Sequence, residues 1–368
     1  MSPKTHSASE LPAWTWIVPS ASAALLLLIL FGVVSSSSPL ALAVAGVFLV
    51  AAVFASVHHA EVIALRVGEP FGSIILAISV TVIEVALLVS IMLSAKEGGD
   101  VIARDTVYAT VMITLNGIVG LCLILGGARH YEQSFQTNAA AVALSVLTTL
   151  AFITLILPNY TRALPGPVYA DSQLIFVGAV SLILYGAFIF VQTIRHRDYF
   201  LSEDGDGGEE AHAQPPTARM ALASLALLSL SLVSVVLLAK IISPWLETAV
   251  ASAGLPKQFV GVIIAAIVLM PEGLASLAAA RKNRLQTSLN LALGSSIATI
   301  GLTIPIVSLT ALILGQHVTL GLLPEEMSLL LVTLFIGTIT LATGRTTILQ
   351  GSVHFVIFAV FLFLSAIP

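Results

Sequence analysis

Two glutamates lie in the middle of long apolar stretches of this sequence. Glu84 interrupts the run "SVTVIEVALLVS", and residues 72–93 carry no other charge. Glu272 lies in "VGVIIAAIVLMPEGLA", directly after Pro271. A charged side chain at the centre of a bilayer helix costs about 2.5–3.5 kcal/mol on insertion scales, so such residues mark functional sites. Because carboxylates are ligands of hard cations and also bind protons, the pair predicts a cation site.

Neutral oxygens accompany each glutamate. Thr81 precedes the first glutamate by three residues and therefore shares its face of a helix. The polar segment after the first glutamate contains Asn116, and the segment after the second contains Ser295 and Ser296. We expect these four side chains to bind the cation or proton together with the glutamates. The alternative for each is helix–helix packing, where small and polar residues are common.

Further residues are expected to line the same site. Pro271 removes a helical hydrogen bond and leaves the carbonyl of Ile267 without its donor. A freed carbonyl in the middle of the membrane is tolerated where it lines a cavity or an ion, and a simple kink is the alternative. Gly294 and Thr299 flank the serine pair and are expected to line the site as well.

A third group of titratable residues lies in "SVHHAE". His58, His59 and Glu61 fall toward one end of an apolar stretch. Histidines at this depth are candidates for a proton relay. A location in the headgroup region, with no role in proton transfer, is the alternative.

The chemistry of two facing carboxylates is that of cation–proton exchange. Two carboxylates cancel the charge of a divalent cation, and without it burial and mutual repulsion favour their protonated forms. No Lys or Arg lies in the middle of either apolar stretch to neutralise Glu84 or Glu272. A site that holds either Ca²⁺ or protons, exposed alternately to the two sides of a membrane, makes an antiporter. A Na⁺/H⁺ or K⁺/H⁺ antiporter and a cation channel are the alternatives.

The composition places this site in a membrane. The chain has 368 residues, of which 58% are hydrophobic and 9% are charged, and its mean hydropathy is +1.05. Soluble domains carry roughly 25% charged residues, so the lipid bilayer is the expected environment. The 15 Lys and Arg are dispersed among loops, so no nucleic-acid partner is expected. An enzyme is not expected either, because HExxH is absent and Cys122 is the only cysteine. No cofactor is expected beyond the transported ions.

An all-α polytopic membrane protein follows from the apolar stretches. A membrane-spanning helix needs about 20 apolar residues. Residues 244–254 are too short to cross alone, so they are joined to the preceding stretch. We expect about eleven spans, at residues 14–34, 39–64, 72–93, 106–126, 138–157, 172–194, 218–254, 259–278, 285–314, 327–343 and 346–367.

The two halves of the chain carry one pattern twice. In each half a glutamate precedes a Gly and a Pro, a second Gly opens an apolar helix, and a glutamate follows at its middle. Glu84 comes twelve residues after Gly72, and Glu272 comes eleven after Gly261. The two spans are five apart, so they run in opposite directions. Inverted repeats are typical of secondary transporters with a midplane site.

The repeat divides the chain into four parts: an N-terminal region, a first inverted repeat, an acidic linker and a second inverted repeat. Their expected bounds are 1–36, 37–197, 198–216 and 217–368. With an odd number of spans, ten Lys and Arg fall on the N-terminal side and five on the other. The positive-inside rule then predicts a cytoplasmic N-terminus in a bacterial-type inner membrane.

The sequence resembles the calcium/cation antiporter superfamily, in its cation/proton exchanger branch. The resemblance rests on "GEPFGSIILAISVTVIEVALLVSIML" in the first half. In the second half it rests on "VGVIIAAIVLMPEGLAS" followed by "KNRLQTSLNLALGSSIATIGLTIP". The resemblance implies eleven helices, of which the first is extra and the others form two inverted sets of five. It also implies that Glu84 and Glu272 are the key carboxylates, accompanied by Asn116, Gly294, Ser295 and Ser296.

The sequence departs from the superfamily at one point. Many members have Gly-Asn-x-x-Glu in both repeats, whereas residues 80–84 read VTVIE and residues 268–272 read VLMPE. Thr81 supplies an oxygen in place of the first Asn, and Leu269 supplies none. We therefore expect a site less tailored to Ca²⁺.

Overall fold

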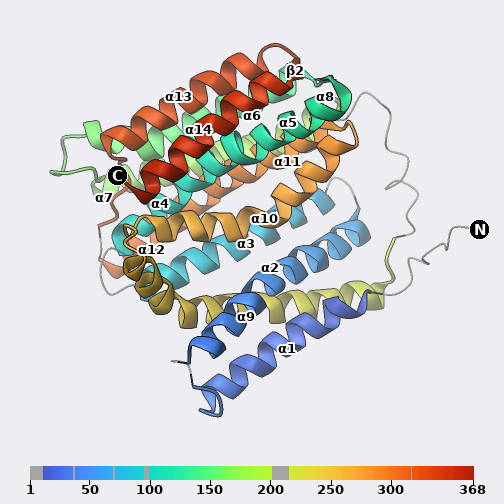
Figure 1. The fold of residues 1–368 in the computed structure, drawn as a ribbon, viewed down its shortest axis with the longest axis vertical. Helices are drawn as coiled ribbons and strands as arrows, with labels where there is room; N and C mark the ends of the chain where they lie inside the picture. The colour runs from blue at the N-terminus through green and yellow to red at the C-terminus, as the bar shows by residue number, and fades with distance from the viewer. Residues whose placement is uncertain (1–10, 36–37, 69–70, 95–98, 201–214, 316) are drawn as a thin grey trace, which may run out of the picture. The chain divides into compact units, whose positions relative to one another are not determined.

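The structure is a computed structural model that describes residues 11–35, 38–68, 71–94, 99–200, 215–315 and 317–368. The first half contains α1 (Ala13–Leu30), α2 (Pro39–Val67), α3 (Phe71–Ser94), α4 (Gly99–Met112), η1 (Ile113–Ile118), α5 (Val119–His130), β1 (Glu132–Ser134), α6 (Thr137–Ala151), η2 (Phe152–Ile156), η3 (Leu157–Tyr160), α7 (Asp171–Phe190), η4 (Val191–Arg195) and α8 (Arg197–Phe200). The second half contains α9 (Ala218–Ser252), α10 (Phe259–Arg281), α11 (Leu285–Ala298), η5 (Thr299–Thr303), α12 (Ile304–Leu314), α13 (Pro324–Leu341), β2 (Arg345–Thr347) and α14 (Ile348–Ala366) (Figure 1).

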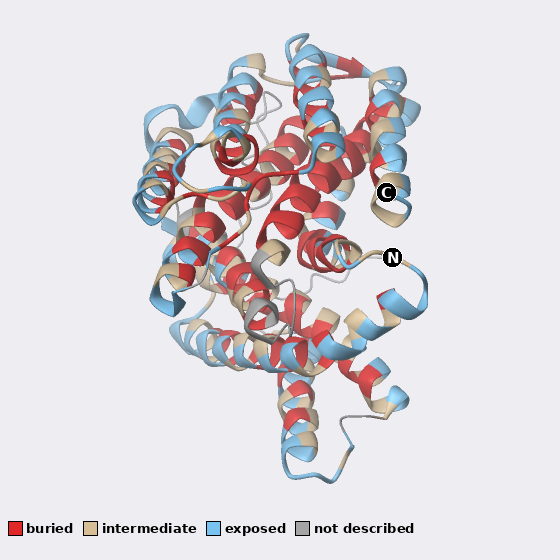
Figure 2. Cartoon of the chain, turned by 90° about the vertical axis from the view of Figure 1, so that its left-hand side faces the viewer, coloured by how far each residue is buried: buried red, intermediate tan, exposed pale blue. Residues whose placement is uncertain are grey.

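The helices confirm an all-α polytopic membrane protein. Ten helices in the described ranges are long and apolar enough to cross a bilayer, and α3 adds an apolar helix of 24 residues. Large apolar side chains such as Ile183, Phe335 and Phe363 are exposed, as expected where helices face lipid. Figure 2 colours the chain by burial and shows helices that carry both buried and exposed residues.

Two boundaries differ from or refine the expected spans. Residues 218–252 form one helix, α9, with Pro244 inside it, which confirms that residues 244–254 are no separate span. Helix α4 begins at Gly99, earlier than expected, so Arg104 lies inside a helix and not in a loop. Most of the expected acidic linker, residues 201–214, lies outside the described residues.

The chain forms two compact units, and each draws on both halves of the sequence. The first unit comprises Met1–Ser90 and Glu203–Trp245, and the second comprises Ile91–Ser202 and Leu246–Pro368. The units therefore cut across the expected repeats 37–197 and 217–368, whose bounds stay a prediction.

The second unit is built around one continuous helix, α4–η1–α5. Its most apolar stretch within Val101–His130 is 78% buried. Helices α10, α11, α13 and α14 all pack against parts of it. At one end of the unit, β1 pairs antiparallel with β2, with Gln133 opposite Thr346.

A π-helical segment occurs in each of the two polar helices. Segment η1 (Ile113–Ile118) separates α4 from α5, and η5 (Thr299–Thr303) separates α11 from α12. Single π turns inside α-helices are frequent at functional sites. Both segments follow a glutamate-bearing helix, so the two halves share this irregularity. Asn116 lies inside η1, whereas Ser295 and Ser296 lie in the turn before η5.

Helices α5 and α14 approach each other so closely that only glycine fits between them. A Cβ atom added at Gly351 would lie 2.7 Å from the backbone nitrogen of Ile124 and 2.8 Å from the carbonyl oxygen of Gly120. Distances this short require the backbones to separate. We call this contact between Gly351 and Gly120 the glycine seam. It sets the distance between α14 and the central helix, as small residues do in membrane helix packing.

We expect Gly351→Ala to destabilise the protein by about 1–3 kcal/mol, the range for overpacked cores. Gly186→Ala is the matched control, because a Cβ there meets no atom within 4 Å in the described structure. The control should be neutral or slightly stabilising, since Ala favours a helix over Gly by about 1 kcal/mol. The test is to heat both variants in detergent and to measure, by size-exclusion chromatography, the fraction of protein that stays folded at each temperature. Equal stability of the two variants would contradict the glycine seam.

Candidate functional site

The first glutamate is buried in the first unit. Glu84 lies on α3 with 4% of its surface exposed, and Thr81, one turn earlier on the same helix, is 3% exposed. A hydrogen bond of 3.2 Å from the Ser90 hydroxyl to the carbonyl of Val236 fastens α3 to α9. The side chains of Thr81 and Glu84 are thus buried, and their role as ligands stays a prediction.

The second glutamate belongs to the second unit. Glu272 lies on α10 directly after Pro271, which is buried inside the helix. Both of its carboxylate oxygens are buried. A Cβ at Gly273, the next residue, would lie 3.2 Å from the side chain of Ile118 at the end of η1. The glutamate therefore occupies a stretch of α10 that packs against the π segment.

Three elements of the second unit meet around this stretch. Helix α10, segment η1 and helix α11 all contact one another. Each contributes a fully buried hydroxyl that has no hydrogen-bond partner among the described residues, namely Ser276, Thr114 and Ser296. Buried polar atoms are nearly always paired, so these oxygens fit a site that binds a cation or proton.

The remaining expected site residues lie on α10, on α11 and in η5. The hydroxyl of Thr299, the first residue of η5, donates a 3.0 Å hydrogen bond to the carbonyl of Ser295. A Cβ at Gly294 would meet no atom within 4 Å in the described structure. Ile267 lies one turn before Pro271 on α10 and is partly buried.

Asn116 is engaged by residues that the sequence analysis did not single out. It is fully buried in η1, and its side chain bonds to His354 of α14 and Thr333 of α13. The only sequence signal for His354 is an isolated imidazole within the apolar run that becomes α14. Of the expected ligands, the second unit thus brings together the elements of Glu272, Asn116 and Ser296. Glu84 and Thr81 belong to the first unit.

The histidine pair of α2 contacts the extra first helix. The Nε2–H of His59 donates a 2.9 Å hydrogen bond to the carbonyl of Thr15, and the ring of His58 lies 5.4 Å from that of Trp14. Glu61 lies 3.9 Å from the His58 Nδ1 atom. The contacts fasten α1 to α2, and the proton-relay role of these residues stays a prediction.

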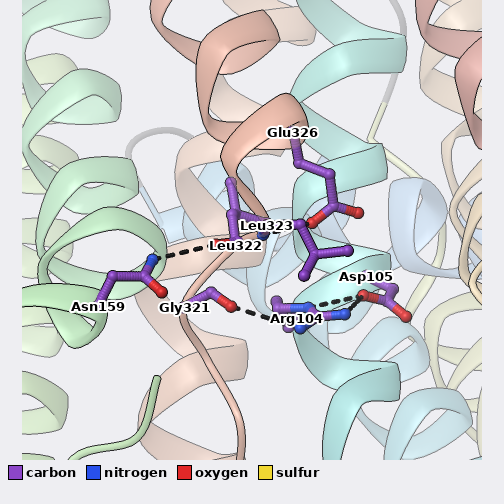
Figure 3. Close-up of polar contacts among 7 residues, drawn as sticks. All are labelled: Arg104, Asp105, Asn159, Gly321, Leu322, Leu323 and Glu326. Carbon is purple, nitrogen blue, oxygen red and sulfur yellow. Dashed lines mark hydrogen bonds and ion pairs between the residues drawn. The ribbon is translucent and has the colours of Figure 1, made fainter. Parts of the chain in front are cut away.

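A buried ion pair lies at the start of α4. The Arg104 side chain bonds to Oδ1 of Asp105 through Nε at 2.8 Å and Nη2 at 2.7 Å, and both residues are 5% exposed. A further bond of 3.3 Å joins Arg104 to the carbonyl of Gly321 (Figure 3). The segment before α13 is held from its other side by Asn159, which donates to the carbonyl of Leu322 at 3.1 Å.

The helix after this segment begins as expected. Helix α13 starts at Pro324 with Glu325 and Glu326 in its first turn, where acidic side chains interact favourably with the helix dipole. Glu326 accepts a 3.0 Å hydrogen bond from the backbone N–H of Leu323 (Figure 3). These glutamates therefore have a structural explanation.

Comparison with known families gives one clear match. The family model described as "Sodium/calcium exchanger protein" matches residues 37–194 and 223–367. Three curated proteins are similar over most of their length. The protein y4hA of Sinorhizobium fredii is 52% identical over 98% of both chains. The sodium-potassium/proton antiporter ChaA of Escherichia coli is 35% identical over 92% of this chain and 93% of its own. The Ca²⁺/H⁺ antiporter of Aphanothece halophytica is 26% identical over 84% and 86%.

Solved structures share the fold. The structure of native YfkE superposes with a TM-score of 0.72, covering 96% of this chain and all of its own, at 16% identity. The H⁺/Ca²⁺ exchanger CAX gives a TM-score of 0.68 over 95% and 89% at 14% identity. The helical membrane fold described above is therefore the fold of these chains.

The Arg104–Asp105 pair generates a prediction about stability. Removing one partner of a buried ion pair leaves a buried charge and typically costs about 3–5 kcal/mol, so we expect Arg104→Met to be strongly destabilising. Adding Asp105→Asn should recover part of the loss, because it removes the uncompensated charge. The control is Arg345→Met, since Arg345 is 71% exposed and lies 3.8 Å from Glu132; exposed pairs contribute less than about 1 kcal/mol. Thermal unfolding in detergent measures all three. Equal effects of the two Met substitutions would contradict the role of the buried pair.

Proposed function

Since the chain belongs to the calcium/cation antiporter superfamily, we propose that it exchanges Ca²⁺ for protons and that Glu84 and Glu272 are the carboxylates that bind these ions. Membership makes it a cation/proton antiporter and an integral membrane protein, and not an enzyme. The observation that carries the proposal is the burial of one glutamate on each of α3 and α10, in stretches without a basic residue. Burial of a carboxylate is costly unless a counter-charge or a proton neutralises it.

The mechanism follows from competition for the same oxygens. A bound cation neutralises the carboxylates, and on its release protons neutralise them instead. Neither carboxylate is then left charged in a poorly solvated place while the site changes its exposure from one side to the other. The hydroxyls of Thr81 and Ser296 and the carbonyl of Ile267 supply neutral oxygens, and Thr299, Gly294 and Pro271 shape the surroundings.

Exchange of monovalent cations is the second candidate. One relative, ChaA, is named a sodium-potassium/proton antiporter, and it is more similar to this chain than the Ca²⁺/H⁺ antiporter of Aphanothece halophytica. Residues 268–272 also lack the Asn that many family members have before the glutamate. Ca²⁺ takes six to eight oxygen ligands. A shell with fewer oxygens favours Na⁺ or K⁺, so we propose that these ions compete with Ca²⁺.

The site is proposed to lie in a bacterial cell membrane with the N-terminus in the cytoplasm. The support is the predicted distribution of Lys and Arg, ten on the N-terminal side against five on the other, and the position of Arg104 inside α4 only lowers the smaller number. A cation channel is the less favoured alternative. Its ion movement would produce current without coupled proton release.

We expect Glu84→Gln and Glu272→Gln each to abolish exchange while the protein still inserts in the membrane. Glutamine keeps the shape of the side chain and removes its charge and its titratable proton. The control is Glu325→Gln, because Glu325 is exposed at the start of α13. Proton release from inverted membrane vesicles on addition of Ca²⁺, Na⁺ or K⁺ measures the exchange. Near wild-type rates in either of the first two variants would refute the two-carboxylate mechanism.

We also expect the apparent affinity for Ca²⁺ to rise with pH. Each proton must leave its carboxylate before the cation binds with full charge, so acid weakens sites built from ionisable ligands. The affinity should level off at alkaline pH, once both groups are ionised, and Na⁺ at high concentration should lower it. Titrations of Ca²⁺-driven proton flux across pH, with and without Na⁺, provide the test. A pH-independent affinity would contradict a shared site, and indifference to Na⁺ would contradict only the proposed competition.

A further inference from the structure

The second unit contains a chain of hydrogen bonds that joins four elements. It links Thr340 of α13 to His354 of α14, then to Asn116 of η1, and returns to Thr333 of α13 before ending at Met112 of α4. All of these side chains are buried, with at most 3% of any of them exposed. A connected buried network of this kind specifies one arrangement of its members.

The Met112 sulfur, the last acceptor, determines the direction of the bonds between it and His354. The sulfur of Met112 cannot donate, so the Thr333 hydroxyl, 3.4 Å away, donates to it. The oxygen of Thr333 then accepts from the amide nitrogen of Asn116 at 2.9 Å. The amide oxygen of Asn116 therefore points toward His354.

The same reasoning places a hydrogen on one nitrogen of the imidazole. The Nδ1 atom of His354 lies 3.1 Å from the amide oxygen of Asn116, which only accepts, so Nδ1 carries the hydrogen. The Nε2 atom lies 3.1 Å from the hydroxyl of Thr340, a group that both donates and accepts, so each ring nitrogen has a hydrogen-bond partner.

The packing of α14 makes this contact possible. At the glycine seam, a Cβ at Gly120 would lie 3.1 Å from the Cβ of His354. Helix α14 is therefore close enough to the central helix for a short-stemmed side chain to reach Asn116. If the two helices lay further apart, only a longer side chain on α14 would reach Asn116.

We propose that His354 is a positioning residue for cation binding, which acts by orienting the carboxamide of Asn116 in η1. The amide oxygen has two lone pairs, and the Nδ1–H of His354 uses one. The amide is held in one orientation, with its oxygen directed by His354 and its nitrogen by Thr333. Since η1 packs against the helices of Glu272 and Ser296, this orientation determines how Asn116 presents its oxygen to the proposed site. The inference rests on the proposed function.

Two substitutions separate this role from simple packing. The amide nitrogen of Asn occupies roughly the place of histidine Nδ1, whereas that of Gln occupies the place of Nε2. His354→Asn therefore keeps a donor to Asn116, and His354→Gln keeps only the contact with Thr340. We expect His354→Gln to raise the apparent Km for the cation by about tenfold or more, the usual effect of removing a group that orients a ligand. His354→Asn should stay close to wild type.

The measurement is proton release from vesicles at a series of Ca²⁺ and of Na⁺ concentrations, which separates the apparent Km from the maximal rate. Ser352→Ala is the control on the same helix, because the bond that the Ser352 hydroxyl makes among the described residues stays within α14, at 2.9 Å from the carbonyl of Ile348. In an Asn116→Ala background, which should itself have the raised Km, His354→Gln should cause no further increase.

The outcomes distinguish the inference from the proposed function. Equal losses in His354→Asn and His354→Gln, or an unchanged Km in His354→Gln or Asn116→Ala, would overturn the inference alone. Additive effects of His354→Gln and Asn116→Ala would overturn it as well. Failure of the wild-type protein to exchange either cation for protons would overturn the proposed function, and this inference with it.

Discussion

Inside a bilayer, a polar side chain finds its hydrogen-bond partners only within the protein, and this constraint sorts the polar residues of this chain. Many hydroxyls bond back to the carbonyl four residues earlier on their own helix, as Ser56 does to Ala52 and Thr154 does to Leu150. Such residues need no neighbour, so they place no demand on how helices pack. They explain why a helix can be rich in Ser and Thr without forming a site.

A second class of polar residues bonds across helices and so determines which helices meet. The hydroxyl of Ser288 donates to the carbonyl of Ser276 at 2.6 Å, which joins α11 to α10. The amide of Gln133 donates to the carbonyl of Ala280 at 3.0 Å, which joins β1 to the end of α10. These contacts connect α10, the helix that carries Glu272, to α11 and to the strand β1 that follows α5.

The apolar stretches were sufficient to predict the helices, because the hydrophobic length of a span is a local property of the sequence. Partners across helices are not local, and there the predictions were incomplete. Asn116 was expected to be a ligand. One of the two side chains that hold it, His354, lies 238 residues away in the sequence and was not foreseen. Arg104 was placed in a loop, although Asp105 and the carbonyl of Gly321, 217 residues away, make its burial in α4 possible. An isolated polar residue in an apolar run indicates that a partner exists but does not identify it.

The oxygens around Glu272 bear on the choice of cation. One turn before this glutamate, where the resemblance to the superfamily implies an Asn, the chain has Leu269, which offers no oxygen. The amide of Asn116 is already held by two neighbours, so it has one lone pair of its oxygen left to offer. Two hydroxyls on α10 and α11 are available as ligands instead, those of Ser276 and Ser296. Both are buried and have no hydrogen-bond partner among the described residues. Hydroxyls are neutral and each supplies one oxygen, so charge neutralisation depends on the glutamates. Two carboxylates balance the charge of one Ca²⁺ or of two monovalent cations, and this is the physical basis of the proposed competition between Na⁺ and Ca²⁺.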